Sequence, residues 1–167
     1  DEAIRLRPGY ASAWCNRGNA KAALGDHEAA IEDYDEAIRL RPGYYAVAWC
    51  NRGSAKAQLG DFDAAIADYG EAIRLQPDDA TAWYNRGSAK ANLDEHEAAI
   101  VDYGEAIRLQ PDNATAWYNR GNVKAELGDR EGALMDLRKA GDLAQEQGKA
   151  SLAEAAASRI ERLRRET

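Results

Sequence analysis

Cysteine, proline and phenylalanine are all scarce in this sequence of 167 residues, which contains 2 Cys, 4 Pro and 1 Phe. Two cysteines, Cys15 and Cys50, are too few for the disulfide framework of a small secreted domain. The few prolines and the single phenylalanine disfavour a disordered chain or a β-rich fold. There is no apolar run long enough to span a bilayer. Free thiols are compatible with a reducing compartment, so a cytoplasmic protein is expected.

Basic residues are also fewer than acidic residues. The chain has 22 Lys and Arg against 29 Asp and Glu, a formal net charge of -7. A polyanionic partner requires a basic footprint, so neither nucleic acid nor an anionic membrane is expected to bind. The abundant Ala, Glu, Arg and Leu favour helix instead.

Catalytic and metal-binding sets of residues are missing as well. Only His27 and His96 could serve as a general base near neutral pH, and both occupy equivalent places far from any Ser or Cys nucleophile. No four ligands converge in the manner of a zinc site. The sequence therefore predicts no catalytic residues, no metal and no cofactor, and the protein is not expected to be an enzyme.

What the sequence does contain is a repeat, which is marked by tryptophan. The spacings between successive tryptophans are 35, 34 and 34 residues, for Trp14, Trp49, Trp83 and Trp117. Around them runs one block in four versions, AWCNRGNAKAALGD, AWCNRGSAKAQLGD, AWYNRGSAKANLDE and AWYNRGNVKAELGD. A fixed period of this length indicates a repeat array.

Each repeat predicts two helices. In the first, Trp14, Gly18 and Ala22 recur at four-residue spacing, which places them on one face. In the second, residues 30–38 follow an i, i+1, i+4, i+7, i+8 apolar pattern that is typical of an amphipathic helix. Between them, Gly25-Asp26 combines a glycine suited to a left-handed helix end with an aspartate suited to cap the next helix.

Two further features mark the ends of these helices. The segment Leu93-Asp94-Glu95 departs from the Gly-Asp turn, so its turn is expected to be costlier. Proline cannot continue a helix, and the second helices are expected to end before Pro42, Pro77 and Pro111.

This spacing of Trp, Gly, Ala, an aromatic residue, Ala and Pro resembles the tetratricopeptide repeat (TPR), as found in bacterial-type arrays. Two positions depart from the family pattern, with Arg in place of the usual Leu and Lys in place of the usual Tyr, as at Arg17 and Lys21. The resemblance implies an all-α fold, a right-handed α-solenoid of stacked antiparallel helix hairpins.

The expected organisation is a single TPR domain over residues 1–167. Residues 1–9 copy residues 35–43, so residues 1–10 are expected to form the second helix of a truncated repeat. Four repeats follow, over residues 11–45, 46–79, 80–113 and 114–147. An inserted residue near Tyr44-Tyr45 lengthens the first inter-repeat turn. Residues 148–167, with an apolar face that includes Leu152 and Leu163, are expected to form a helix that caps the open end.

The resemblance also implies a concave groove, lined by one face of each first helix, that holds an extended peptide or a partner helix. That face is rich in amides and hydroxyls, and the candidate groove residues are Asn16, Asn51, Asn85, Asn119, Asn19, Ser54, Ser88 and Asn122, flanked by Tyr84 and Tyr118. An amide can donate to and accept from a peptide main chain at once. The alternative is that the amides are solvated or bond a neighbouring repeat, and that the tyrosines pack between first helices. Clamps for chaperone C-terminal carboxylates need Lys and Arg on this face, so that specialised role is not expected.

A second set of candidates is structural. A half-buried cation needs a partner, which predicts ion pairs between Arg17, Arg52, Arg86 and Arg120 on the first helices and Asp33, Asp68, Asp102 and Asp136 on the second. Such pairs more often fix register than carry out chemistry.

The function predicted from these features is a scaffold that binds a protein or peptide ligand in its groove. The alternative is self-assembly, in which the uncapped N-terminal end joins two copies into a homo-oligomer.

Overall fold

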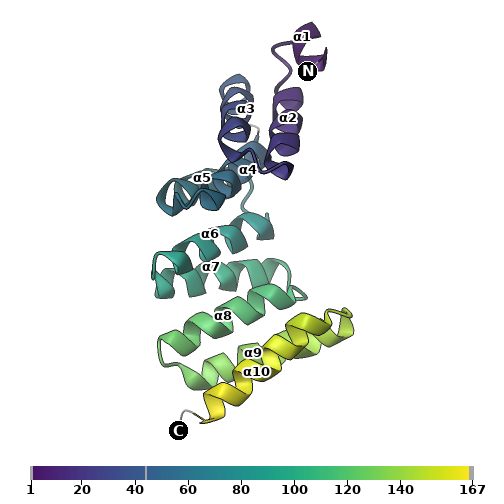
Figure 1. The fold of residues 1–167 in the computed structure, drawn as a ribbon. Helices are drawn as coiled ribbons and strands as arrows, with labels where there is room; N and C mark the ends of the chain where they lie inside the picture. Colours follow the sequence, from purple (N-terminus) through teal and green to yellow (C-terminus); the bar gives the residue numbers. More distant parts are fainter. Residues whose placement is uncertain (1, 44, 166–167) are drawn as a thin grey trace. The chain divides into compact units, whose positions relative to one another are not determined.

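The computed structural model describes residues 2–43 and 45–165, and within these residues the secondary structure is entirely α-helical (Figure 1). The helices are α1 (Glu2–Leu6), α2 (Ala11–Ala23), α3 (His27–Leu40), α4 (Ala46–Gln58), α5 (Phe62–Leu75), α6 (Ala80–Asn92), α7 (His96–Leu109), α8 (Ala114–Glu126), α9 (Arg130–Glu146) and α10 (Ala150–Arg165). The prediction of an all-α fold is confirmed.

The chain divides into two compact units, residues 1–89 and residues 90–167, with the boundary inside α6. We call them the N-terminal unit and the C-terminal unit and describe each by itself. That the whole chain acts as one domain stays a prediction.

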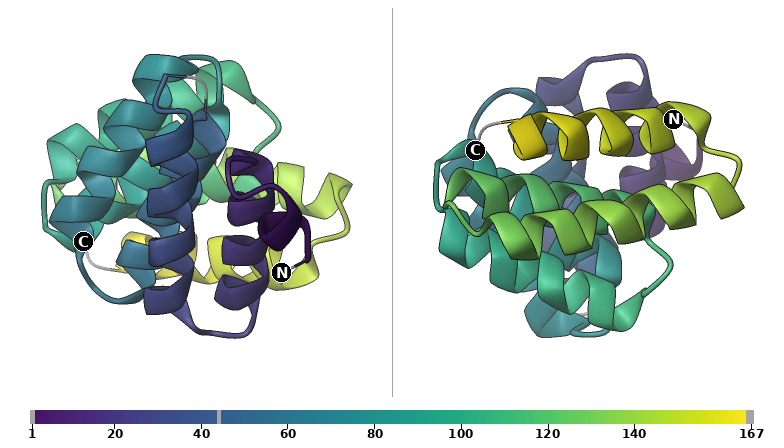
Figure 2. Two further views of the ribbon diagram at one scale, coloured as in Figure 1. Left: turned by 90° about the horizontal axis from the view of Figure 1, so that it is seen from above. Right: turned by 90° about the horizontal axis from the view of Figure 1, so that it is seen from below.

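Within each unit, neighbouring helices pack as hairpins. In the N-terminal unit α2 packs on α3 and α4 on α5, and α3 also contacts α4. In the C-terminal unit α8 packs on α9 and contacts α7. The last helix, α10, lies alongside α9, as the right-hand view of Figure 2 shows.

The hairpin turns follow from their sequence. Gly25 has a φ of 84°, in the left-handed region, and the Asp26 side chain accepts a hydrogen bond from the backbone N–H of Ala29, which caps α3. The turn before α7 has no glycine, and Asp94 takes the left-handed conformation instead, with a φ of 58°. A side chain adopts this region less readily than glycine does, so the sequence departure at this turn has a visible backbone counterpart.

The core of each hairpin is built on a glycine and a facing large side chain. Tyr34 of α3 is 2% exposed and packs against Gly18 of α2, where an added Cβ would lie 2.7 Å from Tyr34 Cε1. Glycine is therefore required because the tyrosine ring fills the space that a side chain would occupy. In the C-terminal unit Leu137 takes the place of the tyrosine, opposite Gly121.

Tryptophan side chains bond the turn before the first helices α2, α6 and α8. The indole Nε1 of Trp14 donates to the carbonyl of Pro8 at 2.8 Å, and Trp83 and Trp117 make the same bond to a proline six residues earlier. Trp49 follows Pro42 by seven residues, and its Nε1 is buried without a partner in the described part of the chain. The predicted insertion falls in this turn; Tyr44 itself lies outside the described residues.

Helix α10 covers the last hairpin. Leu163 is buried in a cluster with Ala133 and Leu137 of α9, and Ile160 packs against the same cluster. Over the described residues, the apolar face of α10 thus lies on α9.

None of the described helices combines the length and the apolar character that a membrane span requires.

Candidate functional site

The amide-rich face predicted for the first helices is organised around Asn19 in the N-terminal unit. Its Oδ1 accepts one hydrogen bond from the Tyr34 hydroxyl and one from Asn51 Nδ2, both at 2.8 Å. These three side chains come from α2, α3 and α4, so one amide oxygen joins three helices.

Beside this junction lies a hollow of about 400 Å³, which we call the amide hollow. It is lined by Asn19, Ala22, His27, Tyr34, Asn51, Ser54, Ala55 and Gln58. None of these is Asp, Glu, Lys or Arg, so the hollow offers hydrogen-bonding groups without a permanent charge.

The next step along the face uses the same positions differently. Ser54, which takes the place of Asn19 in its repeat, donates to the backbone carbonyl of Cys50 at 3.0 Å and accepts from the Tyr69 hydroxyl at 3.2 Å. Asn85 Nδ2 lies 3.9 Å from Cys50 Sγ. The predicted residues Asn51, Ser54 and Asn85 thus each bond a neighbour as well as bordering the face.

The two cysteine thiols accept hydrogen bonds in this arrangement. Burial raises the pKa of the Cys15 thiol, and hydrogen bonds from Asn51 and Tyr45 offset part of that rise. Burial, with a smaller contribution from the charge of Asp79, raises the pKa of Cys50 to about 11. Both thiols are free and buried, and a protonated thiol is a weak nucleophile.

Asn16 lies apart from the other candidate groove residues. It lines a different hollow of about 470 Å³, whose other lining residues are Ala3, Ile4, Tyr10, Ala13, Arg17 and Ala20. This N-terminal hollow lies between α1 and α2. Asn16 is equivalent to Asn51 in the repeat, but Asn51 faces a preceding first helix, whereas the element that precedes α2 is α1.

In the C-terminal unit the predicted groove positions are engaged by α9 and α10. Asn122 Oδ1 accepts a hydrogen bond from Arg159 Nε of α10 at 3.2 Å. Tyr118 packs against the cluster of Ala133, Leu137 and Leu163. The remaining candidates, Tyr84, Ser88 and Asn119, are half-buried on α6 and α8.

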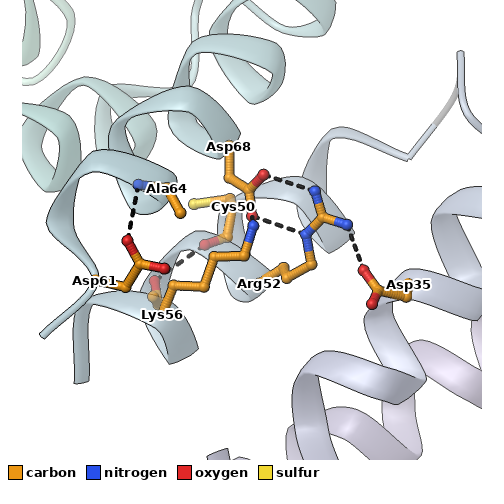
Figure 3. Close-up of polar contacts among 8 residues, drawn as sticks. Asp35, Cys50, Arg52, Lys56, Asp61, Ala64 and Asp68 are labelled. Atoms are coloured by element: carbon orange, nitrogen blue, oxygen red, sulfur yellow. Dashed lines mark hydrogen bonds and ion pairs between the residues drawn. The ribbon is translucent and has the colours of Figure 1, made fainter. Parts of the chain in front are cut away.

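The predicted arginine and aspartate residues meet within both units. Arg17 donates through Nε and Nη2 to the two carboxylate oxygens of Asp33, at 2.8 and 2.6 Å. The same bidentate geometry joins Arg52 to Asp68 and Arg120 to Asp136. Figure 3 shows the second of these pairs.

Two further contacts complete each ion-pair site, and neither was predicted from the sequence. The Arg17 guanidinium lies 4.7 Å from the centroid of the Trp14 ring, three residues earlier on the same helix. Lys21 Nζ lies 3.0 Å from an Asp33 carboxylate oxygen. The Trp-x-x-Arg spacing, repeated in every copy, was the available signal for the ring contact.

The charge state of Asp33 follows from these contacts. Burial by itself raises the pKa of this carboxyl, but hydrogen bonds from Arg17 and Lys21 outweigh burial, and the pKa lies below its ordinary value of 3.8. The aspartate is therefore a buried carboxylate that stays ionised because two cations bind it.

Arg52 makes one more contact, which links two repeats. Its Nη1 donates to Asp35 of α3, in the preceding hairpin (Figure 3). The position of Asp35 is held by Gly70 and Gly104 in the next two repeats. A Cβ at Gly104 would lie 3.7 Å from Arg120 Nη1. Of these three equivalent positions, only Asp35 has a carboxylate that can pair with the arginine of the next repeat.

The residues of the remaining predicted pair, Arg86 and Asp102, belong to different units and are described separately. Arg86 lies in the N-terminal unit, over the Trp83 ring at 4.8 Å from its centroid. Asp102 lies in the C-terminal unit, where Lys90 Nζ approaches its carboxylate at 2.8 Å. In the described residues, no group of three or more His, Cys, Asp or Glu side chains is placed to hold a metal ion.

Models of known protein families match the repeats of this chain. A family model described as TPR repeat matches residues 53–94 and 93–128, and two models described as tetratricopeptide repeat match residues 11–44 and 114–147. The chain belongs to the tetratricopeptide-repeat family. The TPR hairpins named by these matches are those that carry the amide face and the Arg–Asp pairs.

Solved TPR structures share the fold. A crystal structure of MamA is 25% identical and covers 89% of this chain and 86% of its own, with a TM-score of 0.83. YrrB, described as a TPR protein with an unusual peptide-binding site, is 25% identical over 95% of this chain and 79% of its own, with a TM-score of 0.78. The first TPR of Spaghetti (RPAP3), bound to the HSP90 peptide SRMEEVD, is 28% identical over 71% of this chain and 93% of its own, with a TM-score of 0.69. No curated protein sequence matches the chain.

Proposed function

We propose that this TPR chain is a scaffold that binds an extended peptide or a partner helix along the face of its first helices, and that it carries out no chemistry of its own. The observation that carries the proposal is the amide hollow, where Asn19 and Asn51 are joined by a 2.8 Å hydrogen bond and border about 400 Å³ of space.

The amide face complements the hydrogen-bonding groups of a peptide main chain. A peptide that lies on a protein surface must replace the water bonded to its own N–H and C=O groups. A row of amides supplies donors and acceptors at once and does not require a charged ligand. The amides at Asn51 and Asn85 are half-buried and held by neighbours, so little side-chain entropy is lost when they bind.

The structural relatives support a peptide-binding role, and comparison with them indicates the charge of the ligand. YrrB is described as having a peptide-binding site, and the RPAP3 repeat was solved with the acidic peptide SRMEEVD. The equivalent face here carries Asn, Ser, Thr, Cys and Tyr in place of the cations that an acidic tail requires. We therefore propose a predominantly uncharged ligand, and not the carboxylate tail of a chaperone.

The test first obtains a peptide ligand by a selection that does not require the natural partner to be known. Random twelve-residue peptides displayed on phage are selected against the full chain, and the selected peptides are synthesised with a fluorescent label. Fluorescence anisotropy then gives Kd for the wild type and for the double variant Asn51→Ala/Asn85→Ala. We expect the double variant to bind at least about tenfold more weakly, because two hydrogen-bonding groups are lost.

A matched control variant removes a side-chain amide that is not among the candidate groove residues. Gln76→Ala truncates an exposed amide at the end of α5 and should leave the affinity unchanged. Circular dichroism establishes that the variants remain folded. Equal affinity of the double variant and the wild type for all selected peptides would contradict the proposal.

A second candidate function is self-association through the N-terminal hollow, which is lined by Ala3, Ile4 and Tyr10 and is about 470 Å³ in volume. Tyr10 is 51% exposed, and apolar surface of this kind favours association. Multi-angle light scattering should then show a concentration-dependent dimer that Ile4→Asp abolishes. A wild-type chain that stays monomeric at high concentration would exclude this second function and leave the first untouched.

A further inference from the structure

The polar atoms of the amide hollow have fixed orientations that restrict which ligand group can bind there. Asn19 Oδ1 accepts from both Tyr34 and Asn51. A carboxamide oxygen has two lone pairs, so both are used. The Asn19 Nδ2 group is what remains for a ligand, and it provides two N–H donors.

Asn51 has the complementary orientation. Its Nδ2 donates to Asn19 Oδ1, and its amide also hydrogen-bonds to the Cys15 thiol. With the nitrogen directed to these two acceptors, Oδ1 of Asn51 is the atom left to accept a hydrogen bond. The hollow therefore presents a donor pair and an acceptor side by side.

Buried neighbours hold this pair, and there is room beside it. Tyr34, which holds Asn19, is 2% exposed. Ser54 does not compete for a ligand acceptor, because its only proton is donated to the Cys50 carbonyl. Ala22 and Ala55 line the hollow with short side chains, so space exists for a side chain that enters from a bound peptide.

Charge further restricts the ligand. Asp33, a buried carboxylate of α3, is already paired by Arg17 and Lys21. A ligand carboxylate or ammonium that enters the hollow would lose water without gaining a counter-ion. An apolar group would cover the Asn19 donors without satisfying them. A carboxamide, with one acceptor and two donors, matches the hollow on both counts.

In the C-terminal unit, one of two repeat positions that line the amide hollow carries a charged residue. The equivalents of His27 and Gln58 there are His96 and Glu126, whose Nε2 and Oε2 atoms lie 3.6 Å apart. In the N-terminal unit the glutamine leaves the corresponding edge of the amide hollow uncharged. The Nδ1 atoms of His27 and His96 are alike in being buried without a hydrogen-bond partner among the described residues.

We propose that the amide hollow is a recognition pocket for the side-chain carboxamide of an Asn or Gln residue in the bound peptide. Asn19 Nδ2 donates to the ligand C=O, and Asn51 Oδ1 accepts from the ligand NH₂. The inference rests on the proposed peptide-binding function and specifies the residue type that the ligand carries at this point.

The test uses three small probes that share a peptide backbone and differ in side chain: N-acetylglutamine amide, N-acetylmethionine amide and N-acetylglutamate amide. Each is titrated into the full ¹⁵N-labelled chain, and the side-chain NH₂ signals of Asn19 and Asn51 are followed by NMR. We expect the glutamine probe to shift these signals with a Kd about tenfold lower than that of the methionine probe, which corresponds to two net hydrogen bonds. The glutamate probe should bind more weakly than the glutamine probe.

Two variants locate the site, with Gln76→Ala as the control that changes nothing. Asn19→Leu removes the donors and should abolish the preference for glutamine over methionine. Gln58→Glu rebuilds the His–Glu pair of the C-terminal unit and should weaken the glutamine probe about fivefold or more, since the hollow becomes charged.

Several outcomes would overturn the inference. They are equal binding of the glutamine and methionine probes, no shift with the glutamine probe up to its solubility limit, or a preference that survives in a folded Asn19→Leu protein. If the phage-selected peptides still depend on Asn51 and Asn85, the peptide-binding function stands and only the carboxamide pocket fails. If the glutamine probe binds as expected but the selected peptides ignore those residues, the proposed function fails alone.

Discussion

At the scale of single residues, glycines inside helices differ in how closely neighbouring atoms approach them. A Cβ at Gly18 would meet three ring atoms of Tyr34 within 3.1 Å, whereas one at Gly141 of α9 would meet only the Ala156 methyl at an ordinary 3.7 Å. Both are helical, so replacement by alanine brings the same gain in helix propensity at each.

We therefore expect Gly18→Ala to lower the free energy of unfolding by about 1–3 kcal/mol, because overpacking against a fixed ring outweighs the propensity gain. Gly141→Ala should raise it by about 0.5–1 kcal/mol. Urea denaturation followed by circular dichroism measures both. A Gly18→Ala protein as stable as Gly141→Ala would mean that the tyrosine ring does not confine the first helix.

The buried carboxylate of Asp33 predicts a specific dependence on pH. Its folded-state pKa is lowered because Arg17 and Lys21 outweigh burial, so the stabilisation is complete above the unfolded pKa near 3.9 and is lost as the pH falls through the lower folded value. Asp33→Asn should cost about 2–3 kcal/mol at pH 7.

The difference in unfolding free energy between wild type and Asp33→Asn should shrink as the pH is lowered from about 5 to about 3, since the wild type alone loses this contribution. Urea titrations at several pH values give the two curves. A difference that stays constant over this range would show that the ionised carboxylate does not stabilise the fold.

The tryptophans provide a third comparison at the residue scale. Trp83 Nε1 donates to the Pro77 carbonyl at 2.9 Å, while Trp49 Nε1 is buried without a partner in the described part of the chain. Both indoles stack under an arginine at similar distance, 4.8 and 4.6 Å. Replacement by phenylalanine should therefore cost about 1 kcal/mol more at Trp83 than at Trp49. Thermal unfolding of the two variants tests this, and equal costs would argue against any contribution from the proline bond.

At the scale of helices and hairpins, the contact between Arg52 and Asp35 shows how one repeat is joined to the next. The equivalent position in α7 is Gly104, where a Cβ would lie 3.7 Å from Arg120 Nη1. Gly104→Asp should therefore create a second inter-repeat ion pair, inside the C-terminal unit.

The expected gain of Gly104→Asp over the uncharged control Gly104→Asn is about 0.5–1 kcal/mol, and it should decrease with added salt. Arg108 lies four residues on and offers an alternative partner, so the same comparison is made with Arg108→Ala in both variants. If the gain disappears in that background, the new carboxylate pairs along its own helix and does not join the repeats.

At the scale of the whole molecule, the sequence predicted the elements that depend on local chemistry. The Gly-Asp turns and the prolines indicated where helices such as α3 and α5 begin and end, because each of these signals acts within a few residues. The pairing of Arg17 with Asp33 was also within reach, since two oppositely charged residues recur at equivalent positions in every repeat.

What could not be predicted depends on three helices at once. The orientation of the Asn19 amide is set by Tyr34 and Asn51, which lie on two other helices, and a helical wheel treats each helix alone. For the same reason the wheel grouped Asn16 with Asn51, although Asn16 lines the hollow beside α1. The insertion before Trp49 was visible in the sequence, but its consequence for the indole hydrogen bond was not.

The claim on which the functional account depends is the location of a bound peptide. A phage-selected peptide that carries a nitroxide spin label is added to the ¹⁵N-labelled chain, and paramagnetic broadening is measured residue by residue. We expect the strongest broadening at the side-chain amides of Asn51 and Asn85, with little at the exposed Ala67 of α5. Strongest broadening at Ala67, or at Ile4 and Tyr10 of the N-terminal hollow, would contradict it.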